Sequence, residues 1–125
     1  VAVVLMHAWK HPAHEARIGA IAREEGFTQV SLSHQASPLP RLVPRGDTAV
    51  VDAYLSPILR RYVAQVADEL GAHTKLYFMQ SSGGLTEAAR FQGKDAILSG
   101  PAGGIVGAAR TAAMAGFERI IGFDM

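Results

Sequence analysis

The chain of 125 residues contains no cysteine, which excludes disulfide bonds and a thiol nucleophile. It also lacks any apolar run of about 18 residues, the length that a membrane-spanning helix needs. Aromatic residues make up only 7% of the chain and the net charge is +1, so there is no basic stripe or aromatic platform for nucleic acid. We therefore expect a cytoplasmic domain with neither a membrane nor a nucleic-acid partner.

Short apolar segments alternate with segments of helical periodicity, which predicts an α/β domain with a mostly parallel sheet and flanking helices. We expect this single domain to cover residues 1–125. The expected strands are residues 1–6, 29–33, 75–79, 96–98 and 119–124. The expected helices are residues 12–25, 48–70 and 101–115.

Local patterns predict the buried face of the first helix and the starts of the other two. Ile18 and Ile21 mark the expected buried face of the first helix. Three prolines predict a loop over residues 37–46, after which Asp47 caps the long helix. Ser99 is the expected cap of the last helix, with Pro101 in its first turn.

The last helix is unusually rich in small residues. Gly103, Gly104 and Gly107 lie within two turns, although glycine costs about 1 kcal/mol relative to alanine inside a helix. Either tight packing in the core or close approach of a ligand explains such a helix. Composition favours neither explanation.

Polar residues follow two of the expected strands, at the sheet edge where α/β proteins bind ligands. Residues 80–85 place two hydroxyls and two glycines after one strand, suited either to an anion site or to a plain turn. Asp124 ends the last strand, where a carboxylate can hold Mg²⁺ or cap the next turn. His7, His11 and His14 suggest a metal trio, but a helix start at His11 and Pro12 is the favoured interpretation. The segment Ser33-His34-Gln35, which follows the second strand, is a possible substrate contact.

Three motifs resemble the hydantoinase/5-oxoprolinase family, specifically its hydantoin-utilisation A-type branch. They are Gln-Ser-Ser-Gly-Gly-Leu at 80–85, Gly-Lys-Asp-Ala-Ile-Leu-Ser-Gly-Pro-Ala-Gly-Gly at 93–104, and Gly-Phe-Asp-Met at 122–125. Residues 45–55 are similar to a further stretch of that family. The likeness covers essentially the whole chain, and we expect the chain to be an internal piece of a larger enzyme.

The resemblance implies an actin-like (ribonuclease H-like) ATPase fold that uses ATP and Mg²⁺. We then expect Ser82 and Asp124 to be catalytic and Asp124 to hold the metal. The expected ATP-binding residues are Ser81, Gly83, Gly84, Ser99, Gly100, Gly103 and Gly104. The phosphate hairpins of the family do not occur in these 125 residues.

The resemblance implies an ATP-dependent hydrolase that opens a small cyclic amide, a hydantoin or 5-oxoproline ring, together with a second hydantoinase subunit or domain. ATP would phosphorylate the amide oxygen, and water would then open the activated ring. Two alternatives stay open. One is a non-catalytic actin-like nucleotide-binding module, and the other is the ATPase component of a ketone carboxylase.

Overall fold

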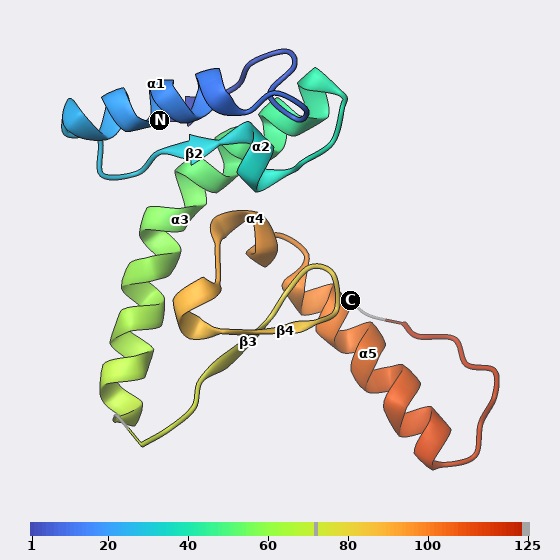
Figure 1. The fold of residues 1–125 in the computed structure, drawn as a ribbon. Coiled ribbons are helices and arrows are strands. Elements are labelled where there is room, and N and C mark those ends of the chain that lie inside the picture. The colour runs from blue at the N-terminus through green and yellow to red at the C-terminus, as the bar shows by residue number, and fades with distance from the viewer. Residues whose placement is uncertain (72, 124–125) are drawn as a thin grey trace. The chain divides into compact units, whose positions relative to one another are not determined.

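The computed structural model describes residues 1–71 and 73–123 (Figure 1). Contacts between residues divide them into two compact units. Unit 1 comprises residues 1–62 and 92–94, and unit 2 comprises the described residues of 63–91 and those from 95 onward. The expectation of one domain over residues 1–125 stays a prediction.

Unit 1 is built on a short parallel sheet. Strand β1 (Ala2–Val3) pairs with β2 (Ser31–Leu32), with Ala2 opposite Ser31 and Val3 opposite Leu32. Helix α1 (Ala13–Glu24) makes the crossover that a parallel pair requires. Helix α2 (Ser33–Ala36) follows β2 directly, and the first part of α3 (Leu42–Leu70) completes the unit.

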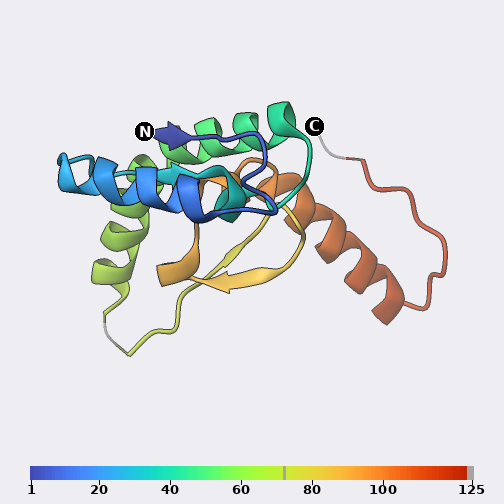
Figure 2. The same ribbon diagram turned by 45° about the horizontal axis from the view of Figure 1, so that its top comes forward.

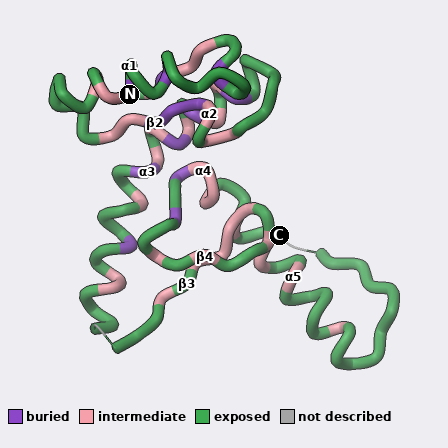
Figure 3. The backbone as a smooth tube through the Cα atoms, in the orientation of Figure 1, coloured by how far each residue is buried: buried purple, intermediate pink, exposed green. Residues whose placement is uncertain are grey.

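The two residues of β2 face opposite sides because side chains alternate along a strand. Leu32 packs against Gly19 of α1, where an added Cβ would lie 2.7 Å from the Leu32 side chain. Ser31 faces α3 instead and donates a hydrogen bond to Asp52 over 2.6 Å. The strand therefore lies between α1 and α3 (Figure 2), and the buried residues of unit 1 gather around it (Figure 3).

Several sequence expectations for unit 1 are wrong in detail. Both strands are shorter than expected, because each is hydrogen-bonded over two residues only. Ile18 and Ile21 are 41% and 42% exposed, and Glu15 and Gly19 occupy the buried face of α1. Helix α3 begins at Leu42, so the expected loop ends earlier and Asp47 lies inside the helix rather than at its cap.

Unit 2 carries an antiparallel hairpin and a long helix. Strand β3 (Tyr77–Met79) pairs with β4 (Leu85–Glu87), and a single 3₁₀ turn, η1 (Ala88–Arg90), follows. The Phe78 ring stacks on Phe91 with centroids 4.9 Å apart, and Phe91 is buried. Helix α4 (Gly93–Ala96) contains the point in the sequence where unit 1 gives way to unit 2, and it leads to α5 (Ser99–Met114).

The sequence prediction differs from unit 2 at three places. Strand β4 is an element that the sequence did not predict, and it makes this sheet antiparallel. Residues 96–98 end α4 and form a turn, and the described residues 119–123 form no strand. An apolar segment becomes a strand only when a neighbour supplies its hydrogen bonds, and nothing among the described residues pairs with residues 119–123. Ser99 is the first residue of α5, where it donates to the Ala96 carbonyl rather than capping the helix.

The architecture is therefore mixed α/β with two short sheets, one parallel and one antiparallel. Helices on both faces of β2 agree with the expected α/β class, whereas a mostly parallel sheet is not what the described residues form. Within residues 1–71 and 73–123, no helix is both long enough and apolar enough to cross a membrane.

Candidate functional site

The segment after β3 forms the tight turn of the β3–β4 hairpin. Gln80 N–H donates to the Gly84 carbonyl over 2.8 Å, and Gly83 N–H donates to the Gln80 carbonyl over 2.9 Å. Gly83 has a φ of 82°, a left-handed conformation that glycine adopts without a Cβ clash. The turn conformation alone therefore accounts for the glycine at position 83.

The two serines of the turn have different surroundings. Ser81 N–H and Ser81 Oγ both donate to the Asp95 carbonyl, over 2.7 and 2.8 Å, and Oγ accepts from Leu98 N–H over 2.9 Å. Ser81 thus fixes the connection between α4 and α5. The Ser82 side chain is exposed and makes no hydrogen bond within the described chain, so its hydroxyl is available to a ligand.

The hairpin turn packs on the N-terminal half of α5. A Cβ on Gly83 would lie 3.3 Å from Val106, and a Cβ on Gly103 would lie 3.4 Å from Met79. The structure therefore brings together Ser81, Gly83 and Gly103, which the sequence placed in two separate motifs. These contacts all lie within unit 2.

The other glycines of α5 do not share this contact. Apart from the backbone of the helix itself, no atom of the described chain lies within 4 Å of a Cβ added at Gly100, Gly104 or Gly107. Gly104 instead lines an open hollow of about 460 Å³ together with Pro101, Gly122 and Phe123. The segment that leads toward Asp124 thus returns alongside the start of α5, although Asp124 itself lies outside the described residues.

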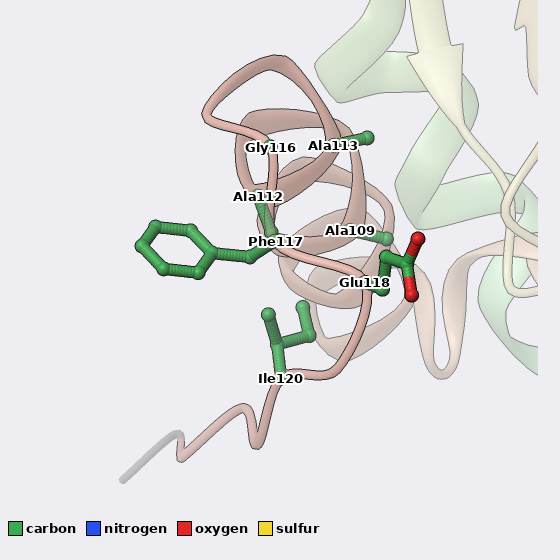
Figure 4. Close-up of a pocket in the computed structure, with 7 residues that line it drawn as sticks. All are labelled: Ala109, Ala112, Ala113, Gly116, Phe117, Glu118 and Ile120. Atoms are coloured by element: carbon green, nitrogen blue, oxygen red, sulfur yellow. The ribbon is translucent and has the colours of Figure 1, made fainter.

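A second hollow, of about 600 Å³, lies at the other end of α5 (Figure 4). Its lining is apolar apart from Glu118, and the Phe117 ring points away from the helix. None of the expected site residues lines it. Its lining residues are Ala109, Ala112, Ala113, Gly116, Phe117, Glu118 and Ile120.

Unit 1 contains a buried charged network that the sequence did not predict. The Glu15 side chain is fully buried, and its two oxygens accept four hydrogen bonds. Oε1 accepts from Leu5 N–H over 3.0 Å and from Ser33 Oγ over 2.6 Å. Oε2 accepts from the backbone N–H and the ring Nδ1 of His34. Burial alone would raise the pKa of Glu15, but the bonds from Ser33, His34 and Leu5 outweigh it, and the pKa lies below its usual value.

Arg45 supplies the opposite charge of this network and is also fully buried. Its Nε donates over 2.9 Å to Ser33 Oγ, the hydroxyl that also bonds Glu15, so one serine bridges the two charges. An arginine has five N–H groups, and all five of them are used here. The other four donate to the backbone carbonyls of Leu39, Pro40, Leu5 and Met6.

His34 is the residue of this network whose side chain reaches solvent. Its ring Nδ1 bonds Glu15, while Nε2 has no hydrogen-bond partner among the described residues. Within that part of the chain, Gln29 Oε1 is the sole buried side-chain polar atom without a partner, so Nε2 is accessible to solvent. The His34 side chain is 15% exposed and lies just beyond the C-terminal end of β2.

Asp52 holds a second polar cluster in unit 1. It accepts from Ser31 Oγ, from Ser56 Oγ over 3.0 Å and from Lys94 N–H over 3.2 Å. A polar cavity of about 180 Å³ lies beside it, and Gln29 lines that cavity. A site of this size and polarity suits ordered water. Asp52 therefore joins β2, α3 and α4.

Metal ligands do not gather in the part of the chain that the structure describes. No group of three or more His, Asp or Glu side chains there could hold a metal ion. The suggested trio of His7, His11 and His14 is therefore not brought together. The magnesium role given to Asp124 stays a prediction.

The comparisons with known proteins decide the family. The Hydantoinase/oxoprolinase family model matches residues 45–125. The chain belongs to the hydantoinase/oxoprolinase family. The resemblance noted from the sequence motifs is thereby confirmed.

Relatives extend this match to the whole chain. The 5-oxoprolinase 1 of Arabidopsis thaliana is 48% identical over 132 residues, which cover 100% of this chain and 10% of the plant protein. The alpha chain of the caprolactamase of Pseudomonas jessenii is 34% identical, and the match covers 99% of this chain and 19% of that protein. The chain thus spans about a tenth of the length of the first of these relatives.

Solved structures support the same fold. The crystal structure of the ATP-dependent caprolactamase from Pseudomonas jessenii matches with a TM-score of 0.82 at 33% identity, over 99% of this chain and 19% of that chain. The nucleotide-free structure of acetone carboxylase matches with a TM-score of 0.77 at 24% identity, over 92% of this chain and 17% of that one. The second match concerns the fold alone.

In this family member, one sequence signal could have revealed the buried network. Glu15 and Gly19 lie one turn apart on α1, so they share a face. A glycine on the inner face allows close packing, and a carboxylate beside it must then be buried and paired. Arg45 has no comparable signal, because its partners lie up to 40 residues away in sequence.

Proposed function

We propose that this chain is part of an ATP-dependent hydrolase that opens cyclic amides of the 5-oxoproline or hydantoin type. The 48% identity with a 5-oxoprolinase over the whole chain carries the proposal. The match with an ATP-dependent caprolactamase supports the use of ATP. Caprolactam is also a cyclic amide. An amide carbonyl resists attack by water, and phosphorylation of its oxygen makes the carbon more electrophilic. The activated ring is then hydrolysed.

We place the nucleotide contacts of this enzyme at the hairpin turn and the first turn of α5, within an actin-like fold. Exposed Ser82, Gly84 and Gly100 offer a hydroxyl and unshielded backbone, and a helix N-terminus favours phosphate. The hydroxyl of Ser81 is already used within unit 2, so in this proposal Ser81 and Gly83 hold the turn in position. Ser99 begins the helix, Gly103 accommodates Met79, and Gly104 leaves its face of the helix open.

The metal and catalytic roles follow from the same proposal. Asp124 would hold Mg²⁺, which neutralises phosphate charge during transfer. The Ser82 hydroxyl would donate a hydrogen bond to developing charge. Gly122 and Phe123, which precede Asp124, line the hollow beside Gly104 and so support this placement.

We further propose that the active protein contains a second subunit or domain of the hydantoinase type. Support comes from the caprolactamase relative, which is described as the alpha member of a multi-subunit enzyme. A cytoplasmic location remains a prediction.

The test uses the full-length protein with 5-oxoproline, hydantoin or ε-caprolactam, with and without Mg·ATP. We expect ring-opened product by mass spectrometry together with ADP release, for at least one ring and only when ATP is present. Absence of product from all three rings, or equal product without ATP, would contradict the proposal.

The same assay separates the two alternatives. ATP-dependent consumption of acetone and bicarbonate without ring opening would indicate the carboxylase. Nucleotide binding without turnover of any substrate would indicate a non-catalytic module.

A further inference from the structure

The polar cavity beside Asp52 belongs entirely to unit 1. Its volume is about 180 Å³, and all of its lining residues lie within residues 1–62 or 92–94. Long polar side chains from four separate parts of the fold contribute to the lining. They are Arg23 in the last turn of α1, Gln35 in α2, Arg60 in α3 and Gln92 immediately before α4. Folding of unit 1 alone therefore assembles this cavity.

The inner side of the cavity is held by a chain of hydrogen bonds. Gln29 Nε2 donates to Ser31 Oγ over 2.8 Å, and Ser31 Oγ donates in turn to Asp52 Oδ2. The other Asp52 oxygen, Oδ1, accepts from Ser56 Oγ and from Lys94 N–H. Asp52 is only 7% exposed and forms no ion pair with an arginine of the described chain. Both of its oxygens are thus already used by unit 1.

The two arginines of the cavity have no partner within the described chain. Arg23 and Arg60 are exposed, and neither guanidinium makes a hydrogen bond or an ion pair with a described residue. The exposed side chains of Gln35 and Gln92 also lack such bonds there. A guanidinium stays protonated in proteins. Two unpaired positive charges and two unpaired amides therefore face one acidic side chain whose oxygens are occupied, a lining that favours an anion.

Volume and charge together indicate the class of anion. Roughly six waters, at about 30 Å³ each, would fill a cavity of this volume. Pockets for drug-sized ligands begin at about 300 Å³, so a nucleotide is too large. A guanidinium matches the planar carboxylate group and can bond both of its oxygens. A monocarboxylate would leave one of the two guanidiniums without a counter-ion, whereas a small dicarboxylate neutralises both.

We infer that this cavity binds a small dicarboxylate, with Arg23 and Arg60 as its cationic contacts and the amides of Gln35 and Gln92 as further hydrogen-bond partners. The inference concerns binding to unit 1 and does not depend on the proposed reaction. L-Glutamate belongs to this class and is also the ring-opened form of 5-oxoproline, which makes it the first probe.

The experiment compares L-glutamate with L-glutamine and with inorganic phosphate. L-Glutamine has nearly the same size, but an amide replaces one carboxylate. Isothermal titration calorimetry measures the Kd of each for the full-length wild type and for Arg23→Gln and Arg60→Gln. Arg61→Gln is the matched control, because Arg61 is the next residue of α3, is equally classed as exposed and does not line the cavity.

We expect Arg23→Gln and Arg60→Gln each to raise the Kd of L-glutamate by about 5- to 20-fold, the loss of one charge-assisted contact at an exposed position. Arg61→Gln should change it by less than about twofold. L-Glutamine should bind the wild type at least about fivefold more weakly than L-glutamate. Equal Kd values for the two amino acids, tighter binding of phosphate, or no binding of any probe would overturn the inference.

A second measurement reports on this cavity directly and needs no variant. Phenylglyoxal modifies accessible guanidiniums, and mass spectrometry follows the rate at each arginine of the wild type. At about ten times its Kd, L-glutamate should slow modification of Arg23 and Arg60 by about tenfold and leave Arg61 unaffected. Unchanged rates at Arg23 and Arg60, or equal slowing at Arg61, would refute the contact. Ring opening is assayed separately, so protection in a protein that opens no ring would reject the proposed reaction and retain this site.

Discussion

Glu15 is the residue on which most of the buried network in unit 1 depends. It joins the chain after β1 to the start of α2, because its donors are Leu5, Ser33 and His34. A buried charge is tolerated when every hydrogen-bonding position is filled and an opposite charge lies nearby, and both conditions hold here. The same bonds lower the pKa of Glu15 and so link its ionisation to folding.

We expect unit 1 to lose stability in acid because of Glu15. Its pKa is lower in the folded protein, so its contribution is complete above the usual carboxyl value of about 4.3 and is lost as the pH falls through the folded-state value. Hydrogen exchange at the Leu5 and His34 amides, both donors to Glu15, measures the opening free energy between pH 7 and 3.5.

Glu15→Gln provides the comparison for this pH dependence. At pH 7 it should lower the opening free energy by about 1–3 kcal/mol, since an amide cannot accept all four bonds. It should also flatten the acid dependence. Glu24→Gln, at an exposed position of α1, should change neither quantity. An acid dependence in Glu15→Gln as steep as in the wild type would refute the assignment.

Gly93 and Gly104 differ in the space that an added Cβ would find. A Cβ on Gly93 would lie 2.7 Å from Ser56 N and 2.8 Å from Leu55 Cβ, atoms that cannot move aside. We expect Gly93→Ala to destabilise unit 1 by about 1–3 kcal/mol through overpacking. Gly104→Ala should be neutral or stabilise α5 by up to about 1 kcal/mol, because no atom of the described chain outside the helix backbone itself lies within 4 Å of its Cβ position.

Thermal unfolding of the two alanine variants of the full-length protein measures this difference. A larger loss of Tm for Gly104→Ala than for Gly93→Ala would contradict the packing described above. It would also show that another segment covers α5 at Gly104, which is the tight-packing explanation of this glycine-rich helix.

At the scale of elements, the β3–β4 hairpin and α5 act together. The turn is held to the α4–α5 connection by Ser81 and contacts α5 through Gly83 and Val106. Ser82 belongs to the same turn but makes no such bond. Of the two neighbouring serines, Ser81 is therefore used by the fold, and the proposed chemical role belongs to Ser82.

We expect Ser82→Ala to lower kcat for ring opening by about 10-fold or more with little change in Tm, because its hydroxyl is free to act on developing charge. Ser81→Ala should instead lower Tm and increase hydrogen exchange at the Leu98 amide, whose acceptor is removed. Steady-state kinetics and exchange on both variants test the pair. Unchanged kcat in Ser82→Ala would return this turn to a purely structural role.

At the scale of the whole molecule, the described surface of α5 and the segment after it remains largely apolar and uncovered. Met114 is 90% exposed, Ile121 98% and Phe123 88%. The chain also spans about a tenth of the length of its plant relative. Catalysis of phosphoryl transfer is mostly positioning of groups, and these 125 residues carry only some of the groups that the proposed reaction needs.

We therefore expect a protein of these 125 residues alone not to hydrolyse ATP. A coupled ADP assay with Mg²⁺ measures this, with the full-length protein as the positive control and Gly103→Leu in the short chain as the background. Magnesium-dependent turnover by the short chain above that background would contradict the expectation.

The sequence alone determined the α/β alternation, the extent of α5 and the family. These follow from local properties: periodicity fixes a helix, and long motifs with fixed spacing carry the resemblance. The Ser81 turn and the Gly103 helix do lie together, but through the contacts of Gly83 with Val106 and of Gly103 with Met79, and not through the parallel sheet edge that the sequence predicted.

Only the tertiary structure decided which strands pair and which polar groups are buried. Residues 119–123 are as apolar as a strand, yet they pair with nothing in the described chain, since strand formation requires a partner that local sequence does not specify. Glu15, Ser33 and Arg45 are individually ordinary surface residue types. They form one buried network because folding brings together groups 12 to 40 residues apart in the sequence.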